Sequence, residues 1–262
     1  MNLSPVTQTL QLFIWFLALA EFILALYILL LNVWHPSNRH VGVSLLMLAI
    51  NNFGLGLAVN ATDAAQATLP TYVLAATSPA IQPGLLLVAV CLLKPRWLRG
   101  RWRVGGWLVY GLVFLPALLT LVDVRLGTRL WYTGFDAEAY AGGYVPLFEY
   151  TAGRLSLPIR VLSFYGTPVA TIIALLYVAL RDKEATPLTR RLAWLFLGTQ
   201  IAGVTIQMGL RGLLGPVERV LITGIVFVLA YAYAGFRQMV SERRWACATT
   251  RMVIGIAELR KK

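Results

Sequence analysis

A single carboxylic acid within an apolar segment is the residue of this chain best suited to chemistry. Glu21 lies in Ala18–Leu19–Ala20–Glu21–Phe22, near the middle of an apolar run of about 25 residues. An ionisable side chain at that depth of a bilayer costs on the order of 3 kcal/mol, so it should face other helices, be partnered or carry a proton. The sequence therefore predicts a polar site inside a helix bundle.

Four amide side chains fall at a similar depth of other apolar segments. They are Asn51 and Asn52 in the second segment, Gln82 in the third and Gln200 in the sixth. One interpretation is a polar core that binds a ligand, an ion or a proton. The other is a set of hydrogen bonds that hold the helices together, for which an amide suffices. Because a carboxyl group is costlier than an amide, Glu21 favours function more than the others do.

A second candidate site lies in the longest loop, at about 123–157. It is rich in aromatic residues, and its candidate ligand contacts are Trp131, Tyr132, Tyr144, Glu149 and, at the start of the next segment, Arg160. The functional interpretation is a lid over a ligand pocket. The alternative is an interfacial segment, since Trp and Tyr favour the headgroup level of a membrane.

Several kinds of chemistry have no residues to support them. The chain has two histidines, His35 and His40, and none of its lysines lies in the last apolar segment, as a retinal protein would need. It contains no HExxH, CxxC, GxSxG or Gly-rich phosphate loop. Cys91 and Cys247 are not expected to pair. We therefore predict no enzyme, no metal site and no cofactor.

The composition predicts a membrane protein. Hydrophobic residues make up 58% of the 262 residues, charged residues only 13%, and the mean hydropathy is +0.71. A bilayer core of about 30 Å needs about 20 mostly apolar residues for each crossing. The predicted fold class is all-α, a polytopic seven-transmembrane helix bundle. The expected spans are 8–32, 41–62, 71–93, 104–122, 158–180, 192–210 and 217–236.

The basic residues predict the orientation of the bundle. Loops of one parity, with the segment 237–262, carry 17 Lys and Arg, against 6 in the other loops. The positive-inside rule then places the N-terminus outside and the C-terminus in the cytoplasm, in a prokaryotic inner membrane. The net charge of +12 is spread along the ends of the spans and not in one patch, so no nucleic-acid binding is expected.

Four short motifs carry a resemblance to a known family. They are the loop Trp34–His40, the outer segment Tyr144–Phe148, the basic Thr189–Arg191 before span six, and Leu229–Tyr233 leading to Arg237. With the seven spans, residues 1–237 resemble the N-terminal seven-transmembrane sensor region of bacterial histidine kinases. The resemblance implies helices that sense an external or membrane signal. It also implies that the last helix passes the signal to cytoplasmic PAS, GAF, kinase or cyclase domains.

The segment 238–262 sets the expected mode of action. Its apolar residues recur every three or four positions between arginines, which fits a basic amphipathic helix on the inner membrane surface or against a partner. A coiled-coil signalling linker and a disordered basic end are the alternatives. A kinase needs a phosphoacceptor histidine after the last span, and none follows it here. We therefore expect a sensor that signals through a cytoplasmic protein.

Two other functions remain open. The chain is alternatively an accessory or structural subunit of a larger membrane complex, contacted through 238–262, or a small transporter that uses Glu21. A structural subunit should tolerate the change Glu21→Gln. A proton- or cation-coupled transporter should lose activity with it, and a receptor should change its resting state or its ligand response.

Overall fold

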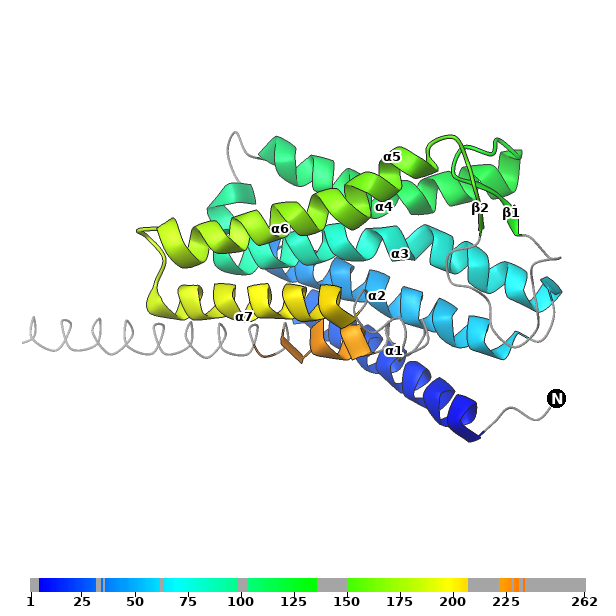
Figure 1. Cartoon of the computed structure of the whole chain (residues 1–262), viewed down its shortest axis with the longest axis horizontal. Helices are drawn as coiled ribbons and strands as arrows, with labels where there is room; N and C mark the ends of the chain where they lie inside the picture. Colours follow the sequence, from blue (N-terminus) through cyan, green and yellow to red (C-terminus); the bar gives the residue numbers. More distant parts are fainter. Residues whose placement is uncertain are drawn as a thin grey trace, which may run out of the picture.

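The computed structural model describes most of the chain as packed helices (Figure 1). The described residues are 5–31, 34, 36–61, 64–98, 103–135, 150–206, 222–227, 229, 230 and 233. The long helices are α1 (Pro5–Leu31), α2 (Pro36–Asn60), α3 (Ala64–Leu93), α4 (Arg103–Leu126) and α7 (Pro187–Val204). A short 3-10 turn, η1 (Pro95–Leu98), follows α3.

The fifth predicted span forms one helical run from Ser156 to Arg181. It consists of α5 (Ser156–Val161), the π-helical turn η3 (Leu162–Gly166), α6 (Thr167–Leu176) and a second π-helical turn, η4 (Tyr177–Arg181). Before it, β1 (Tyr132–Phe135) and β2 (Tyr150–Ala152) form a two-stranded antiparallel ribbon. This ribbon is the one non-helical element of the described chain, and it lies within the predicted loop at 123–157.

Five helical segments of the described residues are long and apolar enough to cross a membrane. They are Gln11–Leu30, Asn38–Val59, Ala65–Leu93, Val104–Leu126 and Ser156–Arg181, which match the first five predicted spans. The helical fold class is thus confirmed, but seven spans are not. Helix α7 covers only part of predicted span six, and span seven is described only at 222–227, 229, 230 and 233. The tail 238–262 lies outside the described residues.

Prolines explain most of the helix starts. Helix α2 begins at Pro36, η1 at Pro95 and α7 at Pro187, where the missing N–H costs no hydrogen bond. The side chain of Thr186 caps α7 by accepting a hydrogen bond from the Thr189 N–H at 3.1 Å. The sequence predicts span three from residue 71, directly after Pro70, but α3 begins earlier, at Ala64, and includes this proline.

Helix α3 is central in the bundle, with α2, α4, α6 and α7 packed around it (Figure 1). One apolar core joins α3, α6 and α7 with Phe227 and Ala230. A second joins α1, α2 and the first half of α3, with Ile225 packed against it. The described part of the last predicted span therefore lies between these two cores.

A glycine permits the close approach of α7 to this last segment. A Cβ atom at Gly203 would lie 2.8 Å from Cε2 of Phe227. We expect Gly203→Ala to reduce the free energy of unfolding by about 1–3 kcal/mol, because the ring must leave its site. The matched control is Gly198→Ala on the same helix, where a Cβ meets no described atom within 4 Å. It should stabilise the helix by about 0.5–1 kcal/mol. Thermal unfolding in detergent, followed by tryptophan fluorescence, measures both, and equal effects would contradict this packing.

Candidate functional site: a buried polar layer

The structure joins two of the predicted site residues directly. Glu21 is only 1% exposed, and its Oε2 accepts a hydrogen bond from Nδ2 of Asn52 at 2.8 Å. Glu21 lies on the face of α1 that also buries Ile14, Leu17 and Ala25. This spacing of three to four residues is the inner stripe of a helix. Glu21 is therefore buried against other helices and has a partner, two of the arrangements expected for it.

Asn51 continues the polar layer from α2 to α3. Its Oδ1 accepts hydrogen bonds from the hydroxyl groups of Thr77, at 3.2 Å, and Ser78, at 2.7 Å. Because Asn51 and Asn52 are adjacent, one turn of α2 connects α1 on one side with α3 on the other. These bonds are the interhelical kind that holds membrane bundles together.

Gln82 and Gln200 bring polar atoms into the same bundle from α3 and α7. Among the described residues, no hydrogen-bond partner is found for Oε1 of Gln82, Nε2 of Gln200 or Oε1 of Glu21, all of which are buried. The described contacts therefore pair Glu21 with Asn52 and connect Asn51 to α3, but they do not connect either glutamine to these groups. Unpaired polar atoms in an apolar interior are costly, which makes these three the atoms to test for a ligand or proton.

The described residues do not bring the five proposed ligand contacts of the loop together in one site. Trp131 is fully buried among Ala75, Leu119 and Ile159, so it belongs to the core and not to an outer lid or membrane interface. Tyr132 begins β1. Tyr144 and Glu149 lie outside the described residues. Arg160 is partly buried in α5, with its Nη2 shielded from solvent.

Helix α3 contains three prolines, and a proline inside a helix leaves a backbone carbonyl without a helical donor. One of these carbonyls accepts a hydrogen bond from a side chain. Pro79 has no N–H to offer the carbonyl of Ala75, four residues earlier. The indole Nε1 of Trp131 donates to this carbonyl oxygen at 3.1 Å. The side chain that the sequence suggested as a ligand contact therefore completes the backbone hydrogen bonding of α3.

The pairing of Trp131 with the proline gives a testable coupling. Trp131→Phe should reduce the free energy of unfolding by about 1 kcal/mol, because it leaves the Ala75 carbonyl unpaired. In a Pro79→Ala background the alanine N–H can bond to the same carbonyl, so the cost of Trp131→Phe should be smaller. Thermal unfolding of the native chain, the two single variants and the double variant measures the coupling between Trp131 and Pro79. An identical cost in both backgrounds would show that the indole bond has no energetic role.

Asp123 is an important residue that the sequence analysis missed. It lies at the end of α4, where its Oδ1 accepts from the Leu130 N–H at 2.8 Å and from the Thr128 hydroxyl. Its Oδ2 accepts from the Trp131 N–H at 2.5 Å. An acid in the last turn opposes the helix dipole, and this was the available signal that its side chain serves the following loop.

A second missed cluster joins the predicted third and fifth loops. Lys94, which follows α3, forms an ion pair with Asp182, which follows η4. The carbonyl of Asp182 accepts from Nη2 of Arg190 at 3.1 Å. Burial alone would raise the pKa of Asp182, but its hydrogen bonds from Lys94 and the Glu184 N–H, with the charges of Lys94 and Arg190, hold that pKa below 3.8. The alternation of spans places these two loops at one end of the bundle, as observed.

The histidine that opens the second apolar segment also has a structural place. His40 is buried, and its Nδ1 is hydrogen-bonded to the hydroxyl group of Tyr110 in α4.

Among the described residues, no group of three or more His, Cys, Asp and Glu side chains is arranged to hold a metal ion.

No match was found when the chain was compared with protein-family models, curated proteins and solved structures. The resemblance to the sensor region of histidine kinases therefore stays a prediction from the sequence motifs.

Proposed function

We propose that the chain is a multi-pass protein of a prokaryotic cytoplasmic membrane that acts as a receptor-like signalling module. In this proposal it resembles the seven-transmembrane sensor region of histidine kinases and acts on a cytoplasmic signalling protein. The observation that carries the proposal is the buried carboxyl group of Glu21, with one oxygen bonded to Asn52 and the other without a described partner.

The energetic argument separates Glu21 from its amide neighbours. Interhelical bonds such as Asn51 to Ser78 need only neutral groups. A carboxyl group at the same depth adds a cost on the order of 3 kcal/mol when charged, without adding a bond that an amide would lack. The best explanation for a carboxyl group at this position is that Glu21 binds a proton, a cation or a ligand with a hydrogen-bond donor.

The packing offers a route from Glu21 to the last predicted span. Leu17, one turn before Glu21, lies next to Gly224. A Cβ atom added at Gly224 would be 3.9 Å from Cδ2 of Leu17. Phe227 of the same segment lies against Gly203, one turn after Gln200. The segment 222–227 therefore contacts α1 and α7, two of the three helices that carry these polar atoms without a described partner. A ligand that shifts α1 against α7 would move this segment, and such a two-state element is what signalling needs.

The first test is co-purification of the chain from native membranes in mild detergent, with mass spectrometry of the proteins that accompany it stoichiometrically. A kinase, a cyclase or a PAS-containing protein is the expected result. A large respiratory or photosynthetic assembly would overturn the sensor proposal in favour of an accessory subunit.

The second test measures how Glu21→Gln changes the contact between α1 and the last segment, with a pair of introduced cysteines as the reporter. Leu17→Cys and Gly224→Cys, in a chain whose native cysteines are replaced by alanine, allow cross-linking of α1 to the last segment with a short bismaleimide. We expect Glu21→Gln to change the cross-linking yield, because the neutral amide fixes the state that a proton or ligand otherwise selects. The matched control is Glu184→Gln, an exposed carboxyl-to-amide change that should leave the yield unaltered.

The outcomes of this second test separate the three candidates. An unchanged yield and an unchanged set of accompanying proteins in Glu21→Gln would contradict the sensor proposal and support a structural role. Proton or cation uptake by proteoliposomes of the native chain, lost in Glu21→Gln, would identify a transporter instead.

A further inference from the structure

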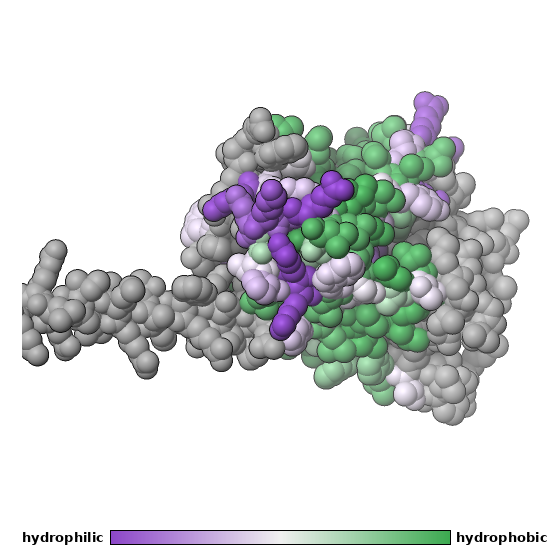
Figure 2. Space-filling model, turned by 60° about the vertical axis from the view of Figure 1, so that its left-hand side comes forward, coloured by the Kyte–Doolittle hydropathy of each residue, from purple (hydrophilic) through white to green (hydrophobic). Residues whose placement is uncertain are grey.

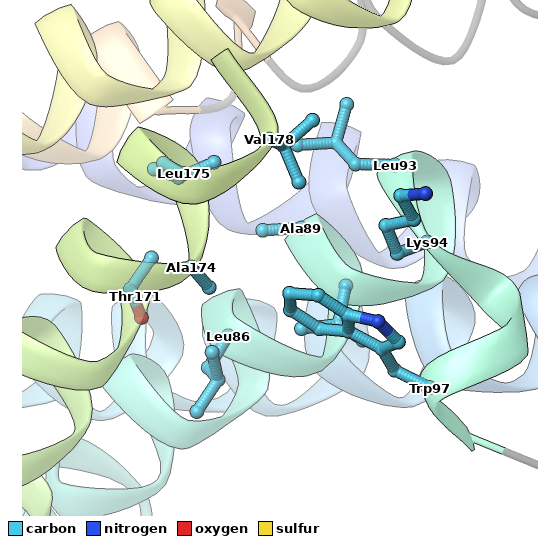
Figure 3. A pocket seen from close by; sticks show the side chains of 10 residues that line it. Leu86, Ala89, Leu93, Lys94, Trp97, Thr171, Ala174, Leu175 and Val178 are labelled. Atoms are coloured by element: carbon cyan, nitrogen blue, oxygen red, sulfur yellow. The ribbon is translucent and has the colours of Figure 1, made fainter. Parts of the chain in front are cut away.

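An apolar recess lies beside the ion-pair cluster at one end of the bundle (Figure 3). Leu86, Ala89 and Leu93 of α3 form one wall, and Thr171, Ala174 and Val178 of α6 and η4 form the other. Lys94 and Trp97 lie at one end of it. The recess is narrow and partly open to the outside.

The walls of the recess are apolar even where a polar residue contributes. The Thr171 hydroxyl donates to the Thr167 carbonyl at 2.7 Å, so its polar group is paired within its own helix. The outward faces of the same helical run expose Ile173 and Leu180. A hydrocarbon chain in the recess would therefore meet apolar side chains, and the helical run beside it has an apolar outer surface.

The charged end of the recess is strongly basic. The described charged residues at this end are six basic and two acidic: Lys94, Arg96, Arg181, Lys183, Arg190 and Arg191 against Asp182 and Glu184. Lys94 is held by Asp182, but Arg96 is 78% exposed and paired only with the exposed Glu184 among the described ion pairs. Figure 2 shows hydrophilic side chains gathered at this end of the molecule, directly beside a broad hydrophobic surface.

Aromatic rings mark the boundary between the apolar and the charged parts. Trp97 lines the recess, and its ring lies 5.7 Å from the ring of Tyr177. Trp and Tyr favour the depth at which lipid headgroups meet hydrocarbon. Basic pockets between transmembrane helices at this depth bind anionic headgroups.

We propose that the recess between α3 and α6 binds one acidic phospholipid, with an acyl chain against Ala89 and Ala174 and the phosphate at Arg96. The occupant follows from the combination of a narrow apolar channel with an excess of positive charge at a single end. A soluble anion would use only the charged part, and a neutral lipid only the apolar part. This inference rests on the membrane placement proposed above but not on the signalling role of Glu21, which none of its variants touches.

The test uses the full chain in nanodiscs of equimolar phosphatidylglycerol and phosphatidylcholine, with native mass spectrometry of the lipids retained after release. We expect enrichment of phosphatidylglycerol. Arg96→Gln should weaken its binding about fivefold, the effect of one basic residue near a membrane surface. Ala174→Phe should also remove the bound lipid by filling the recess. The matched control is Ala170→Phe, which adds the same ring at an exposed position one turn away on the same helix.

Two results would overturn the proposal. Equal retention of the two lipids by the native chain would show that this end of the bundle has no preference for acidic lipid. Loss of phosphatidylglycerol in Arg96→Gln but not in Ala174→Phe would show attraction to the basic surface without an acyl-chain site. Lys94 is left in place in this experiment, because its removal would leave Asp182 buried without its partner.

Discussion

Replacing Asp123 by alanine should reduce the free energy of unfolding by about 3 kcal/mol or more, since each buried donor left unpaired costs about 1–3 kcal/mol. The side chain accepts from two backbone N–H groups and one hydroxyl within residues 128–131. Alanine offers none of these bonds. Because the same turn carries the buried Trp131, losing it also loosens the contact of the indole with Ala75 in α3. Thermal unfolding in detergent measures the loss.

Two control variants separate the hydrogen bonds from the charge and from the turn itself. Asp123→Asn keeps one acceptor oxygen at the same place, so it should cost less than the alanine change. Thr128→Val removes only the hydroxyl donor and should cost least. If alanine and asparagine are equally harmful, the negative charge and not the set of hydrogen bonds stabilises the turn. If Asp123→Ala is as stable as the native chain, the turn is not held by this side chain.

The positions of the first five spans were predictable because lipid and protein interiors select the same residues. A run of apolar side chains about 20 residues long has few alternatives to a helix across the bilayer core. The helix ends were less predictable, since a helix continues into polar residues when its packing is favourable. Helix α3 shows this: it begins at Ala64 and accommodates Pro70, which directly precedes the predicted span.

The depth of the polar residues in the bundle was predictable, but the hydrogen bonds between them were not. Counting residues along each span placed Glu21, Asn51 and Asn52 together, and the structure pairs Glu21 with Asn52. The rotation of each helix decides which neighbours meet, and this depends on packing across the whole bundle. Gln82 and Gln200 were assigned to the same layer, yet the described residues do not connect them to Glu21.

The role of Trp131 was not predictable, because it depends on a proline in another helix. The indole fills the gap in hydrogen bonding that Pro79 makes at Ala75, a residue 56 positions earlier in the chain. The sequence shows a Trp near a membrane boundary and a Pro within a span, both of which have common explanations of their own. Only the folded arrangement brings the donor and the unpaired carbonyl together.

Lys94→Gln should be the other strongly destabilising change. Lys94 is 14% exposed and Asp182 only 4%, so removing the cation leaves a carboxylate shielded from water. Breaking a buried ion pair from one side costs about 3–5 kcal/mol. The double variant Lys94→Gln with Asp182→Asn has two neutral groups that can share a hydrogen bond, and it should recover most of the loss. Thermal unfolding of the single and double variants gives the coupling, and additive losses would show that the two side chains act independently.

The same pair predicts how the stability of the protein responds to acid. The folded-state pKa of Asp182 lies below its ordinary value of 3.8. Its stabilising effect is therefore present above about pH 4, where the unfolded chain also carries the charge, and is lost as the pH falls through the folded-state value. Asp182→Asn removes this response, so the native chain should lose more stability than the variant on going from neutral pH to below pH 4. Equal losses would mean that the pair with Lys94 does not stabilise the ionised form of Asp182. The pair would then position the turn between η4 and α7 by its shape alone.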